Sequence, residues 1–231
     1  MITFYEYMKQ ALGNSGSGYY TSRARIGLEG ADFFTAPERS PAFASLLALQ
    51  IMELDEAMGF PDPFYLIEAG PGNGTLALSL LTIFQAANPG LYERLVPIFY
   101  ELPGILSERQ KERLSGVRLT HPPTWIGPES TSPSPNPGEG LVFGNEFLDA
   151  LPVHRLRLGQ NGWEECYIDR SENGLEETWG PLSTEALGRE LEALSGTGLV
   201  IGQEMEICLE LPVVLGSLDR LLSRRLENPR A

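Results

Sequence analysis

The chain has 231 residues, of which 42% are hydrophobic and 21% are charged, and these fractions predict a globular protein with one sizeable core. Its 31 acidic and 17 basic residues give a net charge of −14, which argues against general affinity for nucleic acid or anionic membrane and favours a basic partner. Because the sequence shows no metal-type cysteine spacing, long apolar run or signal-peptide pattern, we expect no zinc site, no disulfide, no membrane span and a cytoplasmic location.

The N-terminal part of the chain alternates helical and aperiodic segments. Apolar residues at helical spacing predict a short helix that ends at Gly13. Residues 14–34 are rich in glycine and aromatic residues without a period, so their rings need a surface; the body of the domain and a ligand are equally supported as that surface. Ser40 and Pro41, a hydroxyl cap followed by proline, predict the start of a second helix that ends near Gly59.

The central motif is a strand, a glycine turn and a helix. An apolar strand, residues 64–69, precedes the turn, and helical apolar spacing begins near Thr75. The alternating glycines are Gly70, Gly72 and Gly74. Their spacing differs from the G-x-G-x-x-G of dinucleotide sites, so S-adenosylmethionine fits better than NAD. Glu68, at the strand end, suits a ligand that carries an ammonium group. For the motif taken alone, glycines that serve only the packing of the turn remain an alternative.

A second predicted strand, residues 95–100, ends in Glu101, and one predicted helix, residues 76–86, separates it from the glycine turn. In a βαβ unit, an acidic residue at this position can accept hydrogen bonds from both ribose hydroxyls of an adenosine ligand. A solvated charge at the strand end is the alternative for Glu101 alone. Its pairing with Glu68 favours the ribose interpretation.

The next segment contains the longest predicted loop. Residues 106–114 predict a helix and residues 117–120 a brief third strand. Residues 121–140 contain six prolines among serine, glycine and glutamate, which predicts a long surface loop. Trp125 in this loop could cover a purine ring or could pin the loop to the core.

Polar residues follow a further buried strand that we predict at residues 141–144. Because the carboxyl ends of parallel strands open into one crevice, Asn145 and Glu146 would face the same space as the two strand-end carboxylates. Glu146 and Asp149 could bind a guanidinium bidentately and orient it for methyl transfer. An alternative to guanidinium binding has equal support: Asn145 caps the following turn, and the two acids are ordinary residues of its first turn.

The remainder of the chain predicts mostly antiparallel strands. A structural role is favoured over a catalytic one for His154, which follows Pro152 and enters a strand. Two Asn-Gly pairs predict hairpin turns and a small antiparallel meander. Its strands are expected at residues 155–160, 162–170 and 175–179, followed by a helix at 182–194, a strand at 199–209 and a helix at 213–226.

Five blocks of the sequence resemble the MidA family of S-adenosylmethionine-dependent methyltransferases. The blocks are GYY at 18–20, DFFTAPERSPAF at 32–43, EAGPGNGTL at 68–76, YELP at 100–103 and GNEFLDALPVH at 144–154. Mitochondrial members of the family are protein arginine methyltransferases that assist assembly of respiratory complex I. The resemblance implies an α/β fold with a Rossmann-like class I methyltransferase sheet, S-adenosyl-L-methionine as cofactor, and an arginine of a protein, with a respiratory complex subunit as a candidate, as substrate.

The resemblance also implies roles for individual residues. Those assigned to the cofactor are Glu68, Gly70, Gly72, Asn73, Gly74, Glu101, Phe34 and Thr35. Those assigned to the substrate and to catalysis are Asn145, Glu146 and Asp149. Glu146 and Asp149 are similar to the acidic clamp by which arginine methyltransferases hold a guanidinium.

We expect three parts: a helical and loop cap at 1–60, the cofactor-binding core at 61–154, and the meander with the last strand and helix at 155–231. Family members continue past Ala231, so we expect the parallel sheet to be incomplete on its C-terminal side and its open edge to favour a homo-oligomer. The alternative function is a non-catalytic binding or assembly module with the same fold. A nicotinamide oxidoreductase is disfavoured by the glycine spacing.

Overall fold

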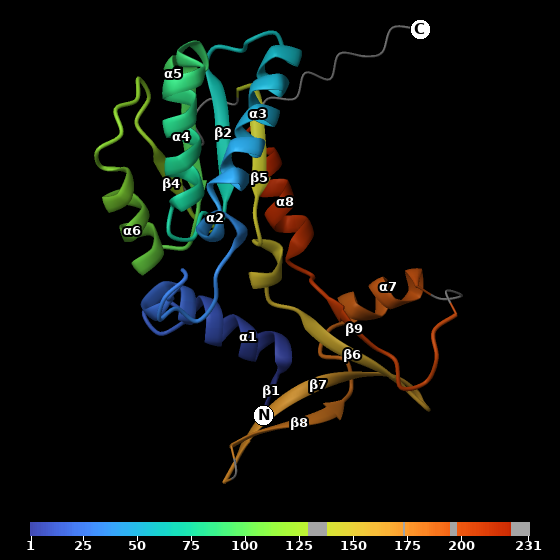
Figure 1. Ribbon diagram of the computed structural model, residues 1–231. Helices are drawn as coiled ribbons and strands as arrows, with labels where there is room; N and C mark the ends of the chain where they lie inside the picture. The colour runs from blue at the N-terminus through green and yellow to red at the C-terminus, as the bar shows by residue number, and fades with distance from the viewer. Residues whose placement is uncertain (129–137, 173, 195–197, 223–231) are drawn as a thin grey trace, which may run out of the picture.

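The computed structural model describes residues 1–128, 138–172, 174–194 and 198–222, which form two sheets (Figure 1). One sheet has four parallel strands in the order β4-β3-β2-β5. The other has five antiparallel strands in the order β1-β7-β6-β9, with β8 paired to β7. The predicted combination of a parallel α/β sheet with an antiparallel meander is confirmed.

The strands of the parallel sheet are β2 (Phe64–Ala69), β3 (Leu95–Tyr100), β4 (Thr124–Ile126) and β5 (Gly140–Gly144). Those of the antiparallel sheet are β1 (Ile2–Thr3), β6 (His154–Gly159), β7 (Gly162–Ser171), β8 (Gly174–Gly180) and β9 (Glu204–Ile207). The helices are α1 (Phe4–Gly13), α2 (Ala36–Arg39), α3 (Pro41–Ala57), α4 (Thr75–Ala87), α5 (Pro89–Arg94), α6 (Ile105–Leu114), α7 (Glu185–Ala193) and α8 (Leu211–Asp219). A π-helical turn spans Tyr19–Arg23, and a 3-10 turn spans Leu148–Ala150.

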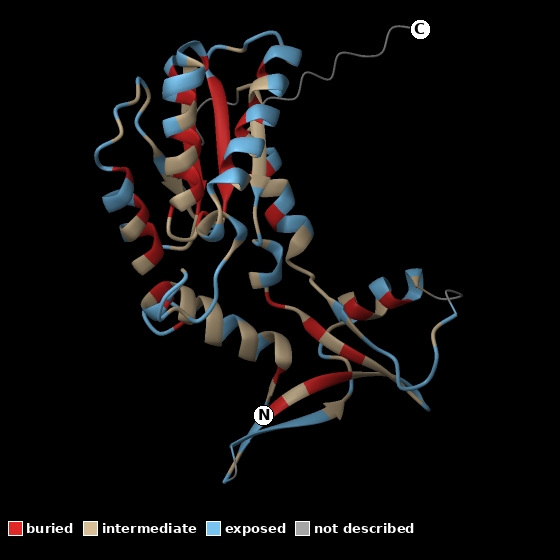
Figure 2. Ribbon diagram, in the orientation of Figure 1, coloured by how far each residue is buried: buried red, intermediate tan, exposed pale blue. Residues whose placement is uncertain are grey.

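Strand β2 lies at the centre of the core and is buried along its whole length (Figure 2). Successive side chains of a strand point to opposite faces of the sheet. Phe64 and Leu66 therefore pack with helices α3 to α6 on one face, whereas Tyr65 and Ile67 pack with α8 on the other. Burial on both faces explains why this strand has a continuous apolar sequence.

The register of the parallel sheet brings its polar strand ends together. Ala69, the last residue of β2, pairs with Tyr100 of β3 and with Gly144 of β5. Glu101 directly follows the end of β3, and Asn145 directly follows the end of β5. Glu68 is the last residue but one of β2. The three predicted site segments consequently meet at one edge of the sheet.

The antiparallel sheet contains the predicted meander. Strands β6, β7 and β8 form successive hairpins that close at the pairs Gly159 with Gly162 and Ser171 with Gly174. Helix α7 packs on one face of this sheet, where Leu187 and Leu191 contact Leu156.

The predicted third strand at 117–120 is wrong, and a strand interrupts the loop predicted at 121–140. The strand lies later, at Thr124–Ile126, because these residues pair with Ile98–Tyr100 of β3. Trp125 packs against the core, so the tertiary contacts of this segment outweigh its proline-rich composition. Residues 129–137 of the predicted loop lie outside the described residues.

Some predicted boundaries at the C-terminal side also differ. The strand expected at 199–209 is limited to β9, since a turn occupies residues 201–202. The helix expected at 213–226 starts two residues earlier and ends at Asp219, and its last predicted residues from 223 onward lie outside the described part.

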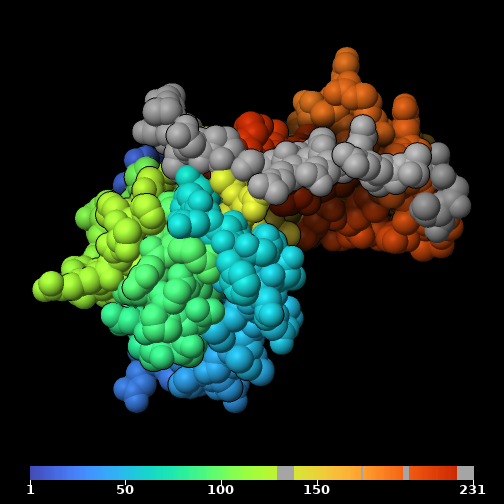
Figure 3. Space-filling view, turned by 90° about the horizontal axis from the view of Figure 1, so that it is seen from above, coloured from blue at the N-terminus to red at the C-terminus, as the bar shows by residue number. Residues whose placement is uncertain are grey.

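The first strand and the last helix of the described chain lie against different sheets. Strand β1 pairs with β7, and α8 packs on the parallel sheet through Val214 and Leu218. Figure 3 shows the parallel-sheet part in cyan and green beside the antiparallel part in orange and red. The N-terminal segment therefore supplies a strand of the antiparallel sheet, whereas α8, which follows the antiparallel strands in the chain, packs on the parallel sheet.

Within the described residues, β5 pairs with β2 alone, so its other edge carries no strand. Self-association through this edge stays a prediction. Across the described ranges, no helix combines the length and the apolar content that a membrane crossing needs.

Candidate active site

A cavity of about 990 Å³ lies at the carboxyl ends of the parallel strands. Most of the predicted site residues line it: Thr35, Glu68, Gly70, Gly72, Asn73, Glu101, Asn145, Glu146 and Asp149. Phe34 and Gly74 are the predicted residues that do not line it. Phe34 is 48% exposed and lies against the guanidinium of Arg39, while Gly74 is the N-cap residue that precedes helix α4.

The glycine turn needs glycine for its backbone and for packing. Gly70 and Gly72 have φ angles of 66° and 56°, which side-chain-bearing residues rarely adopt. A Cβ atom on Gly70 would lie 2.7 Å from the ring of Phe147, and one on Gly72 would lie 3.5 Å from Ile26. Packing against Phe147 therefore excludes a side chain at Gly70, whereas at Gly72 the φ angle alone favours glycine. The turn backbone and the N-terminus of α4 offer N–H groups to a ligand.

Glu68 is a buried acid that lacks one hydrogen-bond partner. Its side chain is 4% exposed, and within the described residues its Oε2 atom has no partner. Burial, with a smaller contribution from the charge of Glu101, raises the pKa of Glu68 to about 8. A buried polar atom of this kind is costly unless a ligand satisfies it, so Glu68 fits a ligand with a cationic or donor group.

Glu101 is held in place by two donors. Its Oε1 atom accepts a hydrogen bond from the backbone N–H of Leu102 at 2.8 Å, and its Oε2 atom accepts one from Nε2 of Gln110 at 3.0 Å. Burial raises the pKa of Glu101 to about 7, and the two donors oppose this rise. Each carboxylate oxygen retains lone-pair capacity for a further donor, as a ribose diol requires.

Gln110 is a site residue that sequence reasoning missed. It lies on α6 and is fully buried beside the cavity. The available signal was its place between Leu106 and Leu114 on the apolar face of that helix, where an amide needs a buried partner.

The segment between α1 and α3 closes over the glycine turn. Glu38 of α2 accepts hydrogen bonds from Asn73 at 3.2 Å and from the Thr75 hydroxyl at 2.7 Å. Asn73 also donates to the Ile26 carbonyl at 2.8 Å. The aromatic segment that needed a surface therefore lies against the turn, and Phe33 lines the cavity.

Glu146 has an unusual backbone conformation beside the cavity. Its φ angle is 52°, the left-handed region that non-glycine residues seldom occupy. Its Oε1 atom accepts hydrogen bonds from Asn145 Nδ2 at 3.3 Å and from the Ala36 N–H at 3.4 Å. Asn145 does not cap the next turn, because Phe147 occupies the cap position without a side-chain bond. Glu146 and Asp149 are both exposed at the mouth of the site.

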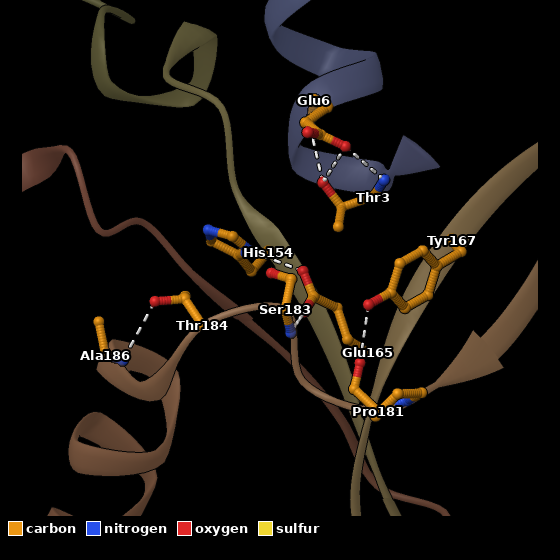
Figure 4. Close-up of polar contacts among 9 residues, drawn as sticks. All are labelled: Thr3, Glu6, His154, Glu165, Tyr167, Pro181, Ser183, Thr184 and Ala186. Atoms are coloured by element: carbon orange, nitrogen blue, oxygen red, sulfur yellow. Dashed lines mark hydrogen bonds and ion pairs between the residues drawn. The ribbon is translucent and has the colours of Figure 1, made fainter. Parts of the chain in front are cut away.

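His154 has structural contacts (Figure 4) and is not among the residues that line the cavity. Its Nδ1 atom lies 2.7 Å from Glu165 Oε1, and Glu165 also accepts a hydrogen bond from the Ser183 N–H at 2.6 Å. The ring of Tyr5 stacks on the imidazole at 4.5 Å. The histidine thus joins β6, β7, α1 and the segment before α7.

Fold and site together define a class of protein. A parallel sheet, a glycine turn before a helix, an unsatisfied buried acid and a second acid at the next strand end form a site for a cationic nucleoside such as S-adenosylmethionine. A family model described as "Putative S-adenosyl-L-methionine-dependent methyltransferase" matches residues 46–227. The chain belongs to this family, the MidA family of S-adenosylmethionine-dependent methyltransferases.

Named relatives and solved structures agree with this assignment. The chain is 34% identical over 243 residues to "Protein arginine methyltransferase NDUFAF7 homolog, mitochondrial" of Drosophila melanogaster, covering 96% of this chain and 53% of that protein. It is 33% identical to the Homo sapiens protein arginine methyltransferase NDUFAF7, covering 73% and 42%. A Burkholderia thailandensis crystal structure bound to S-adenosyl-homocysteine is similar with a TM-score of 0.78 and 30% identity, covering 96% of this chain and 56% of that one. The chain spans about half the length of the curated relatives it matches.

Proposed function

We propose that this chain transfers a methyl group from S-adenosylmethionine to a guanidinium nitrogen of an arginine in a protein substrate. The observation that carries the proposal is the single cavity lined both by Glu68 and Glu101 and by Glu146 and Asp149. The names of the NDUFAF7 relatives support arginine as the methyl acceptor.

The cofactor, when bound, supplies an electrophilic methyl group on a positively charged sulfur. Glu101 would accept hydrogen bonds from the ribose hydroxyls, and the free Oε2 atom of Glu68 would face the cationic part of the ligand. The turn backbone and the start of α4 would contact the carboxylate end of the ligand.

Glu146 and Asp149 would bind the substrate guanidinium. Two carboxylates can hold the planar cation by paired hydrogen bonds, fix its orientation and stabilise its charge. The left-handed backbone of Glu146 is consistent with such a role, because strained conformations cluster at functional sites. Exposure of both acids at the mouth of the site favours an arginine on a protein surface over a small molecule.

The proposal is tested by treating cell extract with purified protein and labelled S-adenosylmethionine, followed by mass spectrometry for methylated arginines. Glu146→Gln is expected to abolish transfer while affinity for S-adenosylhomocysteine stays within about twofold, because the orienting charge is lost but the cofactor pocket is intact. Loss of both properties would instead indicate a folding role for Glu146.

A second function, a non-catalytic binding or assembly module, is favoured by the edge of β5 that carries no strand within the described residues. Binding of S-adenosylhomocysteine without any transfer would support this alternative. A respiratory complex subunit as substrate, which the family resemblance suggests, and a cytoplasmic location stay predictions.

A further inference from the structure

We propose that Gln110 is the positioning residue of the ribose subsite. Its side-chain amide connects the Glu101 carboxylate, the Gly72 carbonyl and the Trp125 indole, and so fixes the carboxylate, the glycine turn and one cavity wall relative to one another. The inference rests on the proposed role of Glu101 in binding the ribose.

Both N–H groups of the Gln110 side-chain amide donate hydrogen bonds to protein atoms. Nε2 donates to the Gly72 carbonyl at 2.7 Å and to Glu101 Oε2 at 3.0 Å, while Oε1 accepts from Trp125 Nε1 at 2.9 Å. A carbonyl oxygen only accepts and an indole N–H only donates, so the amide cannot be reversed without losing its partners. The side chain is 0% exposed, and water does not compete for these bonds.

The hydrogen bonds to the Glu101 carboxylate determine the orientation in which it can bind a ligand. One carboxylate oxygen is bound by the Leu102 N–H and the other by Gln110, so rotation of the carboxylate is restrained at both atoms. Two vicinal hydroxyls need two oxygens in fixed positions, and a restrained carboxylate loses little entropy when it binds them. Donation by Gln110 also opposes the rise in the pKa of Glu101 that burial causes, which favours the ionised acceptor.

Trp125 extends the same network to the cavity wall. Its ring lies 5.3 Å from that of Phe99 and lines the cavity, and the bond to Gln110 fixes the edge of the indole. The Gln110 amide thereby fixes the distance between the Trp125 indole and the Glu101 carboxylate that would bind the ribose. A purely structural amide would support the core without affecting how the protein distinguishes ligands.

The experiment compares Gln110→Met with the unchanged protein by calorimetry, using S-adenosylhomocysteine and its 2′-deoxy analogue. The unchanged protein should prefer the ribose ligand about tenfold or more, the usual effect of a hydrogen bond to a charged acceptor. Gln110→Met should reduce this preference to about twofold, because the carboxylate is no longer held for both hydroxyls. Gln85→Met, the same change at an exposed residue of α4, should leave the preference unchanged.

A Gln110→Met protein that weakens both ligands equally and keeps the full preference would overturn the inference, since this is the behaviour of a structural residue. If that variant does not fold, Trp125→Phe gives the answer. It retains the ring but removes the donor that anchors Gln110, so it should lower the preference about threefold, and an unchanged preference would refute the inference.

The failure of the inference is distinguishable from that of the proposed function. If the unchanged protein binds neither ligand, the cofactor assignment itself is wrong. If it binds both ligands equally, Glu101 does not hold the ribose, and the inference about Gln110 is overturned with it.

Discussion

The carboxyl group of Glu68 combines burial with an unsatisfied oxygen, and this combination predicts a dependence of stability on pH. Its folded-state pKa is raised from 4.5 to about 8, so the folded protein retains a proton that the unfolded chain has released. The contribution of Glu68 to the free energy of unfolding is therefore greatest below about pH 4.5 and falls as pH rises through about pH 8.

Glu68→Gln should remove this dependence, because the amide cannot ionise. At about pH 8.5 the variant should be more stable than the unchanged protein by on the order of a few kcal/mol, and at about pH 5 the two should be similar. Urea denaturation at a series of pH values, without cofactor, measures the difference. Parallel pH profiles for both proteins would contradict a neutral buried Glu68.

Glu101 gives a second prediction at the same scale. Glu101→Ala should cost on the order of 2 kcal/mol of affinity for S-adenosylhomocysteine, because the ribose hydroxyls lose a charged acceptor. Calorimetric titration measures the change, and Glu108→Ala, at an exposed position of α6, provides the control. Unchanged affinity would refute the assignment of the ribose to Glu101.

The meeting of the two strand-end acids could be predicted from sequence, whereas the contacts that Gln110 and Glu38 make at the glycine turn could not. In a parallel sheet the ends of neighbouring strands must meet, so residues at those ends are brought together by the topology alone. Gln110 reaches the same place only because α6 packs against the glycine turn, and Glu38 because the N-terminal segment folds back over it. Such approaches depend on side-chain packing, which spacing along the chain does not specify.

Among the elements, helices α3 and α5 are joined by a buried ion pair. Asp55 is fully buried and receives two hydrogen bonds from the Arg94 guanidinium, at 2.7 and 3.1 Å, and Arg94 also donates to the Pro61 carbonyl. This pair could not be predicted from the sequence, because Asp55 occupies one position in an otherwise ordinary amphipathic helix.

Asp55→Ala should lower the free energy of unfolding by about 3 kcal/mol, because it leaves the mostly buried arginine without its partner. Asp55→Ala combined with Arg94→Met should be more stable than Asp55→Ala alone, since the unpaired charge is then absent. Urea denaturation of the three variants measures both effects. Additive losses in the double variant would show that the pair is not coupled.

The elements themselves were predicted best where local sequence and tertiary contacts agree. Helix α4 and strands β2 and β3 combine strong apolar periodicity with clear turn residues, and they lie close to the expected ranges. Strand β4 was missed because its three residues follow two prolines and gain their strand conformation only by pairing with β3. Short edge strands carry too few residues for a period to appear.

At the scale of the whole molecule, the cavity depends on segments that are far apart in the chain. Residues of α1, the glycine turn, the segment after β5 and the start of α8 all border it. The first described strand pairs within the antiparallel sheet, and the last described helix packs on the parallel sheet. The site is thus assembled by the complete described fold, although its recognition motifs occupy only a few short blocks of sequence.

The net charge of −14, together with the exposed acids at the mouth of the cavity, predicts that salt weakens substrate binding more than cofactor binding. The Debye length falls from about 10 Å at 0.1 M salt to about 3 Å at 1 M, so attraction between exposed charges is largely lost. The contacts of Glu68, which is buried, and of Glu101, which is partly buried inside the cavity, are screened less than those of the exposed acids. Affinity for a basic arginine-containing peptide should therefore fall about tenfold or more over this range, while affinity for S-adenosylhomocysteine should change by less than about threefold.

Fluorescence anisotropy with a labelled peptide measures the affinity for the peptide, and a matched peptide with citrulline in place of arginine should bind weakly at every salt concentration. Equal salt dependence for the arginine and citrulline peptides would show that the acidic mouth does not recognise the guanidinium.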